Sequence, residues 1–230
     1  MSTQHRAGPQ WFRGADADLV VAIYVVRTGG VQFHAGLYHR DHGTPSVLHF
    51  AWDRDLRNDA PDDVVEGYNY GLIALSLDDD DAQTLCALCR QVAATHAATL
   101  RFRFVEWRPR FDLVTASISP QVVDERRGFT CATFVLAMLR SAVAEELLAV
   151  DEWPAPTPDD ADHRWQKKLA SMLRPPGARP EEVASVLAGI GAKRILPTDV
   201  AGGAMWAREH WPVGFAAARR EGEQVAARLQ

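Results

Sequence analysis

Runs of apolar residues predict an antiparallel sheet in the first part of the chain. Residues 19–26 are apolar at nearly every position, the pattern of a strand that is covered on both faces. Residues 33–38 and 46–52 predict two more strands, and the polar loop between them favours an antiparallel hairpin. Residues 71–77 predict a further short strand, whereas residues 53–67, rich in Asp, Arg, Asn and Pro, indicate an exposed loop.

Helical and alternating patterns follow. A run of aspartates begins a predicted helix over 79–98, because the aligned peptide dipoles favour negative charge near a first turn. Residues 100–105 alternate apolar with cationic side chains and predict a half-exposed strand, and residues 112–117 predict one more. A second helix is expected from Cys131 to about Leu148. The order of strands, helix, strands and helix predicts an α+β fold.

The composition divides the chain into a body, residues 1–150, and a helical C-terminal extension, residues 163–230. Residues 151–162 carry prolines at alternate positions and predict an extended linker between the two. Within the extension, the pattern predicts helices at 162–173 and 180–190, a turn at Gly202-Gly203 and a final charged helix that begins near Phe215.

Composition and charge exclude several classes of protein. The 230 residues are 47% hydrophobic, enough for a full core, and the formal net charge is −5 without a dense Lys/Arg cluster. Nucleic acid and anionic membranes are therefore not expected as partners. The longest strongly apolar run is too short to span a bilayer, and the start of the chain lacks the layout of a secretory signal. These features predict a soluble cytoplasmic protein, for which secretion would need a non-classical route.

A cysteine stands at the start of the second predicted helix. Thr130 can cap this helix, and the residues after Cys131 are apolar almost all round, as a buried helix requires. The positive end of a helix favours the thiolate, which is the nucleophilic form of cysteine. Cys131 is therefore a candidate nucleophile, and a small buried cysteine is the alternative interpretation.

Two histidines lie on the neighbouring strands of the predicted hairpin. If His34 and His49 project from the same face, one imidazole can reach the thiol and the second can hold the first in its useful tautomer. This is the logic of a catalytic triad in which a histidine is the orienting residue.

Three segments carry a resemblance to a known family. The segments 33–38, 47–50 and 130–135 resemble the circularly permuted papain-like (NlpC-type) group, which includes the relatives of lecithin:retinol acyltransferase. The resemblance covers roughly residues 19–148 and keeps the order His, His, Cys. It implies a papain-like catalytic domain with an antiparallel sheet packed on the Cys-bearing helix. It also implies Cys131 as nucleophile, His34 as general base and then acid, and His49 as the polar orienting residue.

The chemistry expected from this constellation is acyl transfer on a peptide-like or acyl substrate, with amide hydrolysis ranked first. The Cys131 backbone N–H and Tyr24 are the expected oxyanion donors, and a thiolate–imidazolium pair is expected near neutral pH. An acyltransferase and a non-catalytic module that binds a protein partner through its C-terminal helices are the alternatives. Action on cell-wall peptide would require delivery of the protein as an antibacterial effector.

Other clusters have simpler explanations. Cys86 and Cys89 form a C-x-x-C pattern that is typical here of a buried helix face, with a redox pair as the alternative. His39 and His42 could bind a metal together with His49, although the polarity of a loop explains them. Neither a metal nor a cofactor is therefore expected.

Overall fold

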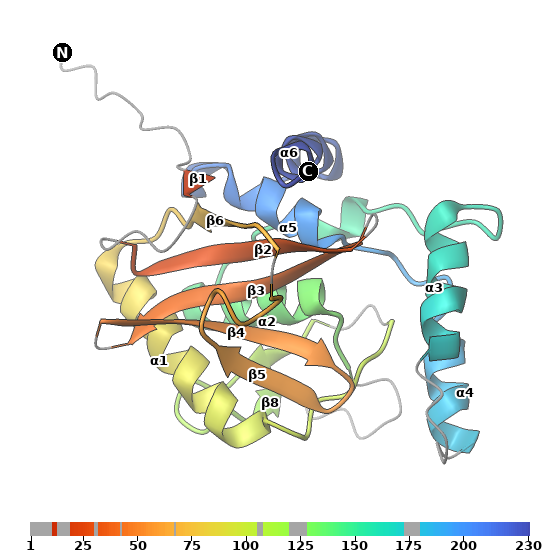
Figure 1. The fold of residues 1–230 in the computed structure, drawn as a ribbon, viewed down its shortest axis with the longest axis horizontal. Coiled ribbons are helices and arrows are strands. Elements are labelled where there is room, and N and C mark those ends of the chain that lie inside the picture. Colours follow the sequence, from red (N-terminus) through yellow and green to blue (C-terminus); the bar gives the residue numbers. More distant parts are fainter. Residues whose placement is uncertain are drawn as a thin grey trace.

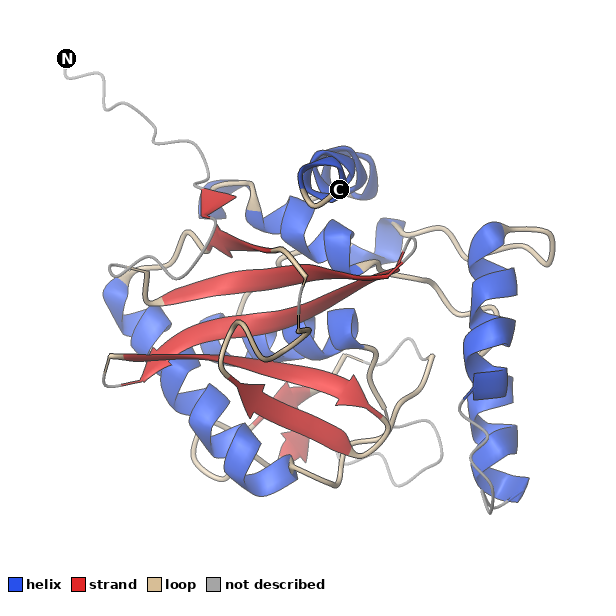
Figure 2. Cartoon of the chain, viewed as in Figure 1, coloured by secondary structure: helices blue, strands red, loops and turns tan. Residues whose placement is uncertain are grey.

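Six strands form one antiparallel sheet at the centre of the fold (Figures 1 and 2). The computed structural model describes residues 11–12, 19–29, 32–41, 43–66, 68–104, 108–119, 128–172 and 180–230. The strand order is β1-β6-β2-β3-β4-β5, and every neighbouring pair is antiparallel. The strands are β1 (Trp11–Phe12), β2 (Val21–Gly29), β3 (Gln32–Asp41), β4 (Thr44–Trp52), β5 (Asp55–Asp59) and β6 (Tyr70–Ala74). Together with the helices below, the sheet confirms the α+β class.

Apolar residues cover both faces of β2, as its continuous apolar sequence predicts. Ile23 and Val25 belong to the large hydrophobic cluster that includes helices α1 (Asp79–His96) and α2 (Cys131–Val143). Tyr24 and Val26 belong to a smaller cluster on the opposite side, because successive side chains of a strand alternate between faces. In Figure 2 α1 and α2 lie behind the sheet.

Local capping explains where α1 and α2 begin. The Asp78 carboxylate accepts a hydrogen bond from the Asp81 N–H at 2.9 Å, and aspartates fill the first turn of α1. Thr130 and Thr133 form a reciprocal capping box at the start of α2. The end of α2 at Val143 is earlier than the predicted Leu148, because Ala144 adopts a left-handed conformation with φ 57°.

The C-terminal region supplies four further α-helices among the described residues. Residues 153–160 contain neither helix nor strand. Helix α5 packs against β2 and β3, and α6 packs against α5, whereas α3 and α4 lie together at one edge of the molecule, on the right of Figure 1. None of the described helices has both the length and the apolar character that a membrane crossing requires. The helices are α3 (Ala161–Met172), α4 (Pro180–Ala188), α5 (Pro197–Ala204) and α6 (Phe215–Arg228), with short 3-10 helices at Val150–Glu152 and Arg208–His210.

Three segments before residue 120 depart from the predicted secondary structure. The charged segment 53–67, predicted as an exposed loop, contains edge strand β5, in which Leu56 is the buried side chain. The segment 100–104 makes an isolated bridge through Phe102 rather than a half-exposed strand, because its aromatic side chains are buried in the core. Val105, the last residue of that predicted strand, lies outside the described residues.

The segment 112–117 is a turn, not the predicted strand. It joins β7 (Arg110–Phe111) to β8 (Ile118–Ser119). The Asp112 carboxylate accepts hydrogen bonds from the backbone N–H groups of Val114 and Thr115, which closes the turn.

Gly202 and Gly203 lie inside α5, which corrects the predicted turn at this position. A Cβ on Gly202 would overlap the carbonyl oxygen of Ala218 and lie 2.5 Å from the backbone nitrogen of Gly222. Glycine is therefore required for the close approach of α5 to α6 rather than for a change of chain direction.

Gly202→Ala is expected to lower the free energy of unfolding by about 2 kcal/mol or more, because the new methyl group meets backbone atoms that cannot rotate away. The matched control is Gly203→Ala, whose methyl group meets the rotatable side chain of Leu148. Urea unfolding followed by circular dichroism measures both. Equal stability of the two variants would contradict the close contact of α5 and α6.

Candidate active site

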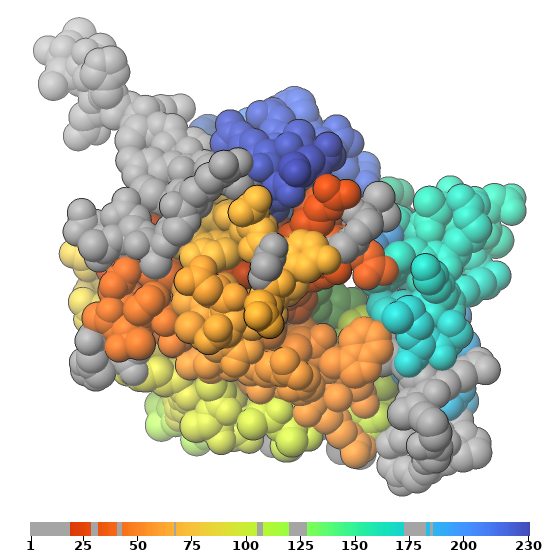
Figure 3. Space-filling model, in the orientation of Figure 1, coloured from red at the N-terminus to blue at the C-terminus, as the bar shows by residue number. Residues whose placement is uncertain are grey.

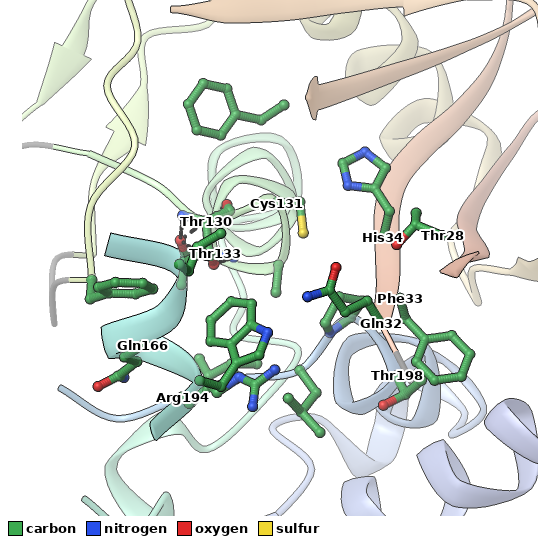
Figure 4. A pocket seen from close by; sticks show the side chains of 18 of the residues that line it. Thr28, Gln32, Phe33, His34, Thr130, Cys131, Thr133, Gln166, Arg194 and Thr198 are labelled. Atoms are coloured by element: carbon green, nitrogen blue, oxygen red, sulfur yellow. Dashed lines mark hydrogen bonds between the residues drawn. The ribbon is translucent and has the colours of Figure 1, made fainter. Parts of the chain in front are cut away.

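Cys131 is the first residue of α2 and lies beside the backbone of β3 (Figure 4). The pairing of β3 with β4 runs from Asp41↔Thr44 to Leu37↔Leu48, so Ala35 lies beyond the end of this ladder. The backbone N–H of Ala35 is close enough to the sulfur to lower the pKa of Cys131. The thiol therefore lies where β3 and β4 part, next to the residue that follows His34.

The two histidines from the hairpin contact each other directly. Nε2 of His34 lies 3.0 Å from Nδ1 of His49, and the rings meet edge to face with centroids 5.0 Å apart. Nε2 of His49 lies 3.1 Å from Oδ2 of Asp59, the last residue of β5. The structure thus brings together the two histidines that the sequence singled out and adds a carboxylate behind them.

Asp59 determines which nitrogen of each neutral imidazole carries the proton. A carboxylate only accepts hydrogen bonds, so Nε2 of His49 is the protonated nitrogen of that ring. Nδ1 of His49 then accepts the bond from Nε2–H of His34, which leaves Nδ1 of His34 as a bare acceptor. The chain of hydrogen bonds therefore presents a proton-accepting nitrogen at residue 34.

Gly36 allows this contact between the strands. A Cβ at position 36 would lie 2.7 Å from Cγ1 of Val47 and 2.9 Å from Cβ of His49. Because glycine leaves this space open, the side chain of His49 can lie across β3 and reach the ring of His34.

Burial shifts the pKa values of the site toward neutral groups. It lowers the pKa of His34 to about 3, with the nearby His49 as the second cause. It also lowers the pKa of His49, against the opposing effect of the hydrogen bond to Asp59. Burial raises the pKa of Cys131, although the N–H groups of Ala35 and Ala132 oppose this shift. These directions favour a thiol beside a neutral imidazole, in contrast to the predicted ion pair.

A cavity of about 600 Å³ contains both Cys131 and His34 among its lining residues. Figure 4 shows the sulfur on the side of α2 that faces the strand of His34. Figure 3 shows the surface hollowed between the strands and the C-terminal helices. Aromatic side chains line much of the cavity, and α3, α5 and α6 contribute residues to its far wall. Phe33, Phe50, Trp52, Phe102, Phe104 and Trp165 are the aromatic lining residues.

The prediction that Tyr24 is an oxyanion donor is wrong. Its hydroxyl donates to the carbonyl oxygen of Pro61 at 3.2 Å, in the hydrophobic cluster on the other side of the sheet. The side-chain amide of Gln32, two residues before His34, lines the cavity instead and can donate hydrogen bonds. The alternation of side chains along β2 and β3 could have excluded Tyr24 as an oxyanion donor. Its side chain lies on the face of the sheet opposite the core that contains α2.

The other clusters give no second site. Cys86 and Cys89 are free thiols on the buried side of α1, as predicted for a helix face. His39 pairs with Asn58 at 2.9 Å, and His42 lies outside the described residues. Within the described ranges, no three His, Cys, Asp or Glu side chains are grouped so that they could hold a metal ion.

Comparisons of the chain with known protein families, with curated proteins and with solved structures found no match.

Acidification is expected to unfold the protein partly through His34. The folded chain keeps this imidazole neutral down to about pH 3, whereas the unfolded chain binds a proton near pH 6.5. Stability is therefore lost as the pH falls from 6.5 toward 3. As the pH falls over this range, the urea concentration at the unfolding midpoint should decrease less steeply for His34→Asn than for the wild type. The exposed His210→Asn is the control, and a wild-type slope in His34→Asn would contradict the assigned pKa.

Proposed function

We propose that the protein is a cysteine hydrolase that cleaves an amide bond through an acyl-enzyme on Cys131. The observation that carries the proposal is the hydrogen-bonded chain Asp59–His49–His34, which ends in the cavity that contains the thiol. A nucleophile, a base and a group that orients the base are the parts that acyl transfer needs. The catalytic roles are those that the sequence predicts, with Asp59 added behind His49.

In the first step the sulfur of Cys131 attacks the carbonyl carbon of the substrate. Nδ1 of His34 takes the thiol proton as the carbon–sulfur bond forms, because the site favours a neutral pair before the reaction. The negative charge moves to the carbonyl oxygen, where the backbone N–H of Cys131 and the amide of Gln32 are the proposed donors. The imidazolium of His34 then gives its proton to the leaving nitrogen, the carbon–nitrogen bond breaks, and a thioester remains.

In the second step water releases the acyl group. His34 removes a proton from water as the water oxygen attacks the thioester carbon. The carbon–sulfur bond breaks, the sulfur regains the proton from His34, and a carboxylic acid leaves. During both steps Asp59 stabilises the proton on Nε2 of His49, so His49 stays an acceptor for His34.

We further propose that the body of the protein is a circularly permuted papain-like core. Three features support this: the order His34, His49, Cys131 along the chain, the position of Cys131 at the start of a helix packed against an antiparallel sheet, and histidines on adjacent strands. A shared fold alone assigns no substrate, so the proposed activity rests on the residues of the site.

The apolar cavity also favours a second outcome for the thioester. Aromatic and aliphatic walls limit the access of water, so an amine or hydroxyl acceptor could take the acyl group in place of water. Analysis of the products formed with and without added acceptors separates hydrolase from acyltransferase.

An intact-mass measurement tests the proposed nucleophile. After incubation with 4-nitrophenyl acyl esters, the wild type should carry one acyl group on Cys131, because this thiol alone among the three lines the cavity together with His34. Acylation should be lost in Cys131→Ala and should slow by about 100-fold or more in His34→Ala. Cys86→Ala is the matched control and should acylate at the wild-type rate. An adduct elsewhere, or equal acylation of Cys131→Ala, would rule out the proposed mechanism.

A further inference from the structure

The C-terminal wall of the cavity carries the cationic side chains Lys193, Arg194 and Arg219. Glu223 is the acidic side chain on the same lining. Two carboxylates that pair with these arginines, Asp162 and Asp199, are not part of the lining. The positive groups thus face the cavity, and part of the balancing negative charge lies behind them.

Arg194 is held in place from two sides. Its guanidinium carbon lies 3.8 Å from the centroid of the Trp165 ring, and Nη1 donates to the Asp162 carboxylate. The side chain is 20% exposed. Because a guanidinium has five N–H donors and Asp162 uses one nitrogen, donors remain for a further acceptor.

Arg219 and Lys193 flank this position with different roles. Nε and Nη2 of Arg219 bind the buried carboxylate of Asp199 at 2.7 and 3.0 Å, which commits Arg219 to the junction of α5 and α6. Lys193 donates to the carbonyl oxygen of Asp151 at 3.0 Å, a bond that leaves its positive charge in place. Arg194 binds its carboxylate through one nitrogen and Arg219 through two, so Arg194 keeps more free donors for a further ligand.

The positive charge of Arg194 also reaches the reacting thiol. It is among the causes that lower the pKa of Cys131 against the raising effect of burial. The cavity that both groups line also has apolar side chains on its walls, including Phe104, Leu169 and Ile195. A ligand that fills this space would place an apolar segment on these side chains, with one end at the sulfur and the other at the guanidinium.

We propose that Arg194 binds a carboxylate of the substrate, so that the substrate is an acyl compound with an apolar segment between its scissile carbonyl and a free carboxylate. A planar carboxylate matches the remaining donors of the guanidinium better than a doubly charged phosphate would, because Asp162 and Glu223 add negative charge nearby. This inference rests on the proposed acyl-enzyme on Cys131 and names the class of substrate that would form it.

A matched pair of probes tests the inference. The mono-4-nitrophenyl ester of adipic acid carries a carboxylate at the end of an apolar chain, and the corresponding adipamate ester carries a neutral amide there. The ratio of their kcat/KM values, after subtraction of the Cys131→Ala background, should exceed about tenfold in the wild type, as expected for hydrogen bonds to a charged group. In Arg194→Gln the ratio should approach one, because the charge is lost.

Two further variants control this measurement. Arg194→Lys keeps the charge but loses the stacked planar group, so part of the preference should remain. Arg220→Gln removes a solvent-exposed arginine on α6 that pairs with Glu221, and the wild-type ratio should persist. A wild-type ratio near one, or an unchanged ratio in Arg194→Gln, would overturn the carboxylate site. Circular dichroism of each variant verifies its fold.

A binding experiment separates this inference from the proposed catalysis. Cys131→Ala and Cys131→Ala/Arg194→Gln are titrated by calorimetry with N-phenyl adipamic acid, an amide that bears an apolar ring and a carboxylate. Binding that weakens about tenfold or more in the double variant supports the site even if neither ester is turned over. Equal affinity of the two proteins, or no binding to either, would refute the carboxylate site. Failure of the catalytic proposal appears differently, as ester turnover that does not depend on Cys131.

Discussion

The candidate site depends on one hydrogen-bonded relay, from Asp59 through His49 to His34. Each bond in it fixes the tautomer of the next ring, because a neutral imidazole has one donor and one acceptor nitrogen. The relay costs desolvation, since His49 is almost fully buried and burial lowers the pKa of both rings. This cost is offset by the hydrogen bonds on both nitrogens of His49 and on Nε2 of His34, and the result is a base with a defined direction.

The fold provides the relay through features at the edge of its sheet. Gly36 allows His49 to lie across β3, and β5 places Asp59 next to β4. The parting of β3 and β4 beyond Leu37 lets the start of α2 approach the backbone of Ala35. The C-terminal helices then cover the cavity, and α6 and the segment between α4 and α5 provide its cations, so the region after residue 150 completes the site that the sheet begins.

Features set by local sequence were predictable, and features set by distant contacts were not. The Thr130 cap and the apolar run after Cys131 lie within one helix, so the pattern predicted its start correctly. Asp59 was missed because β5 is an edge strand whose charged residues resemble a loop, and its position depends on pairing with β4. Gly202 was read as part of a turn because only the packing of α6 reveals the need for glycine inside α5. Arg194 carried no local signal, since only the tertiary fold brings it into the same cavity as Cys131.

The most direct test of the relay is the tautomeric state of the two histidines, measured by long-range proton–nitrogen NMR on the folded protein near pH 7. We expect neutral rings at His34 and His49, each protonated on Nε2, with a shift of the His34 signals in Asp59→Asn because the carboxylate no longer fixes the adjacent ring. Protonation of His34 on Nδ1, or an imidazolium at this pH, would rule out the proposed relay, because the nitrogen that accepts the thiol proton would already carry one.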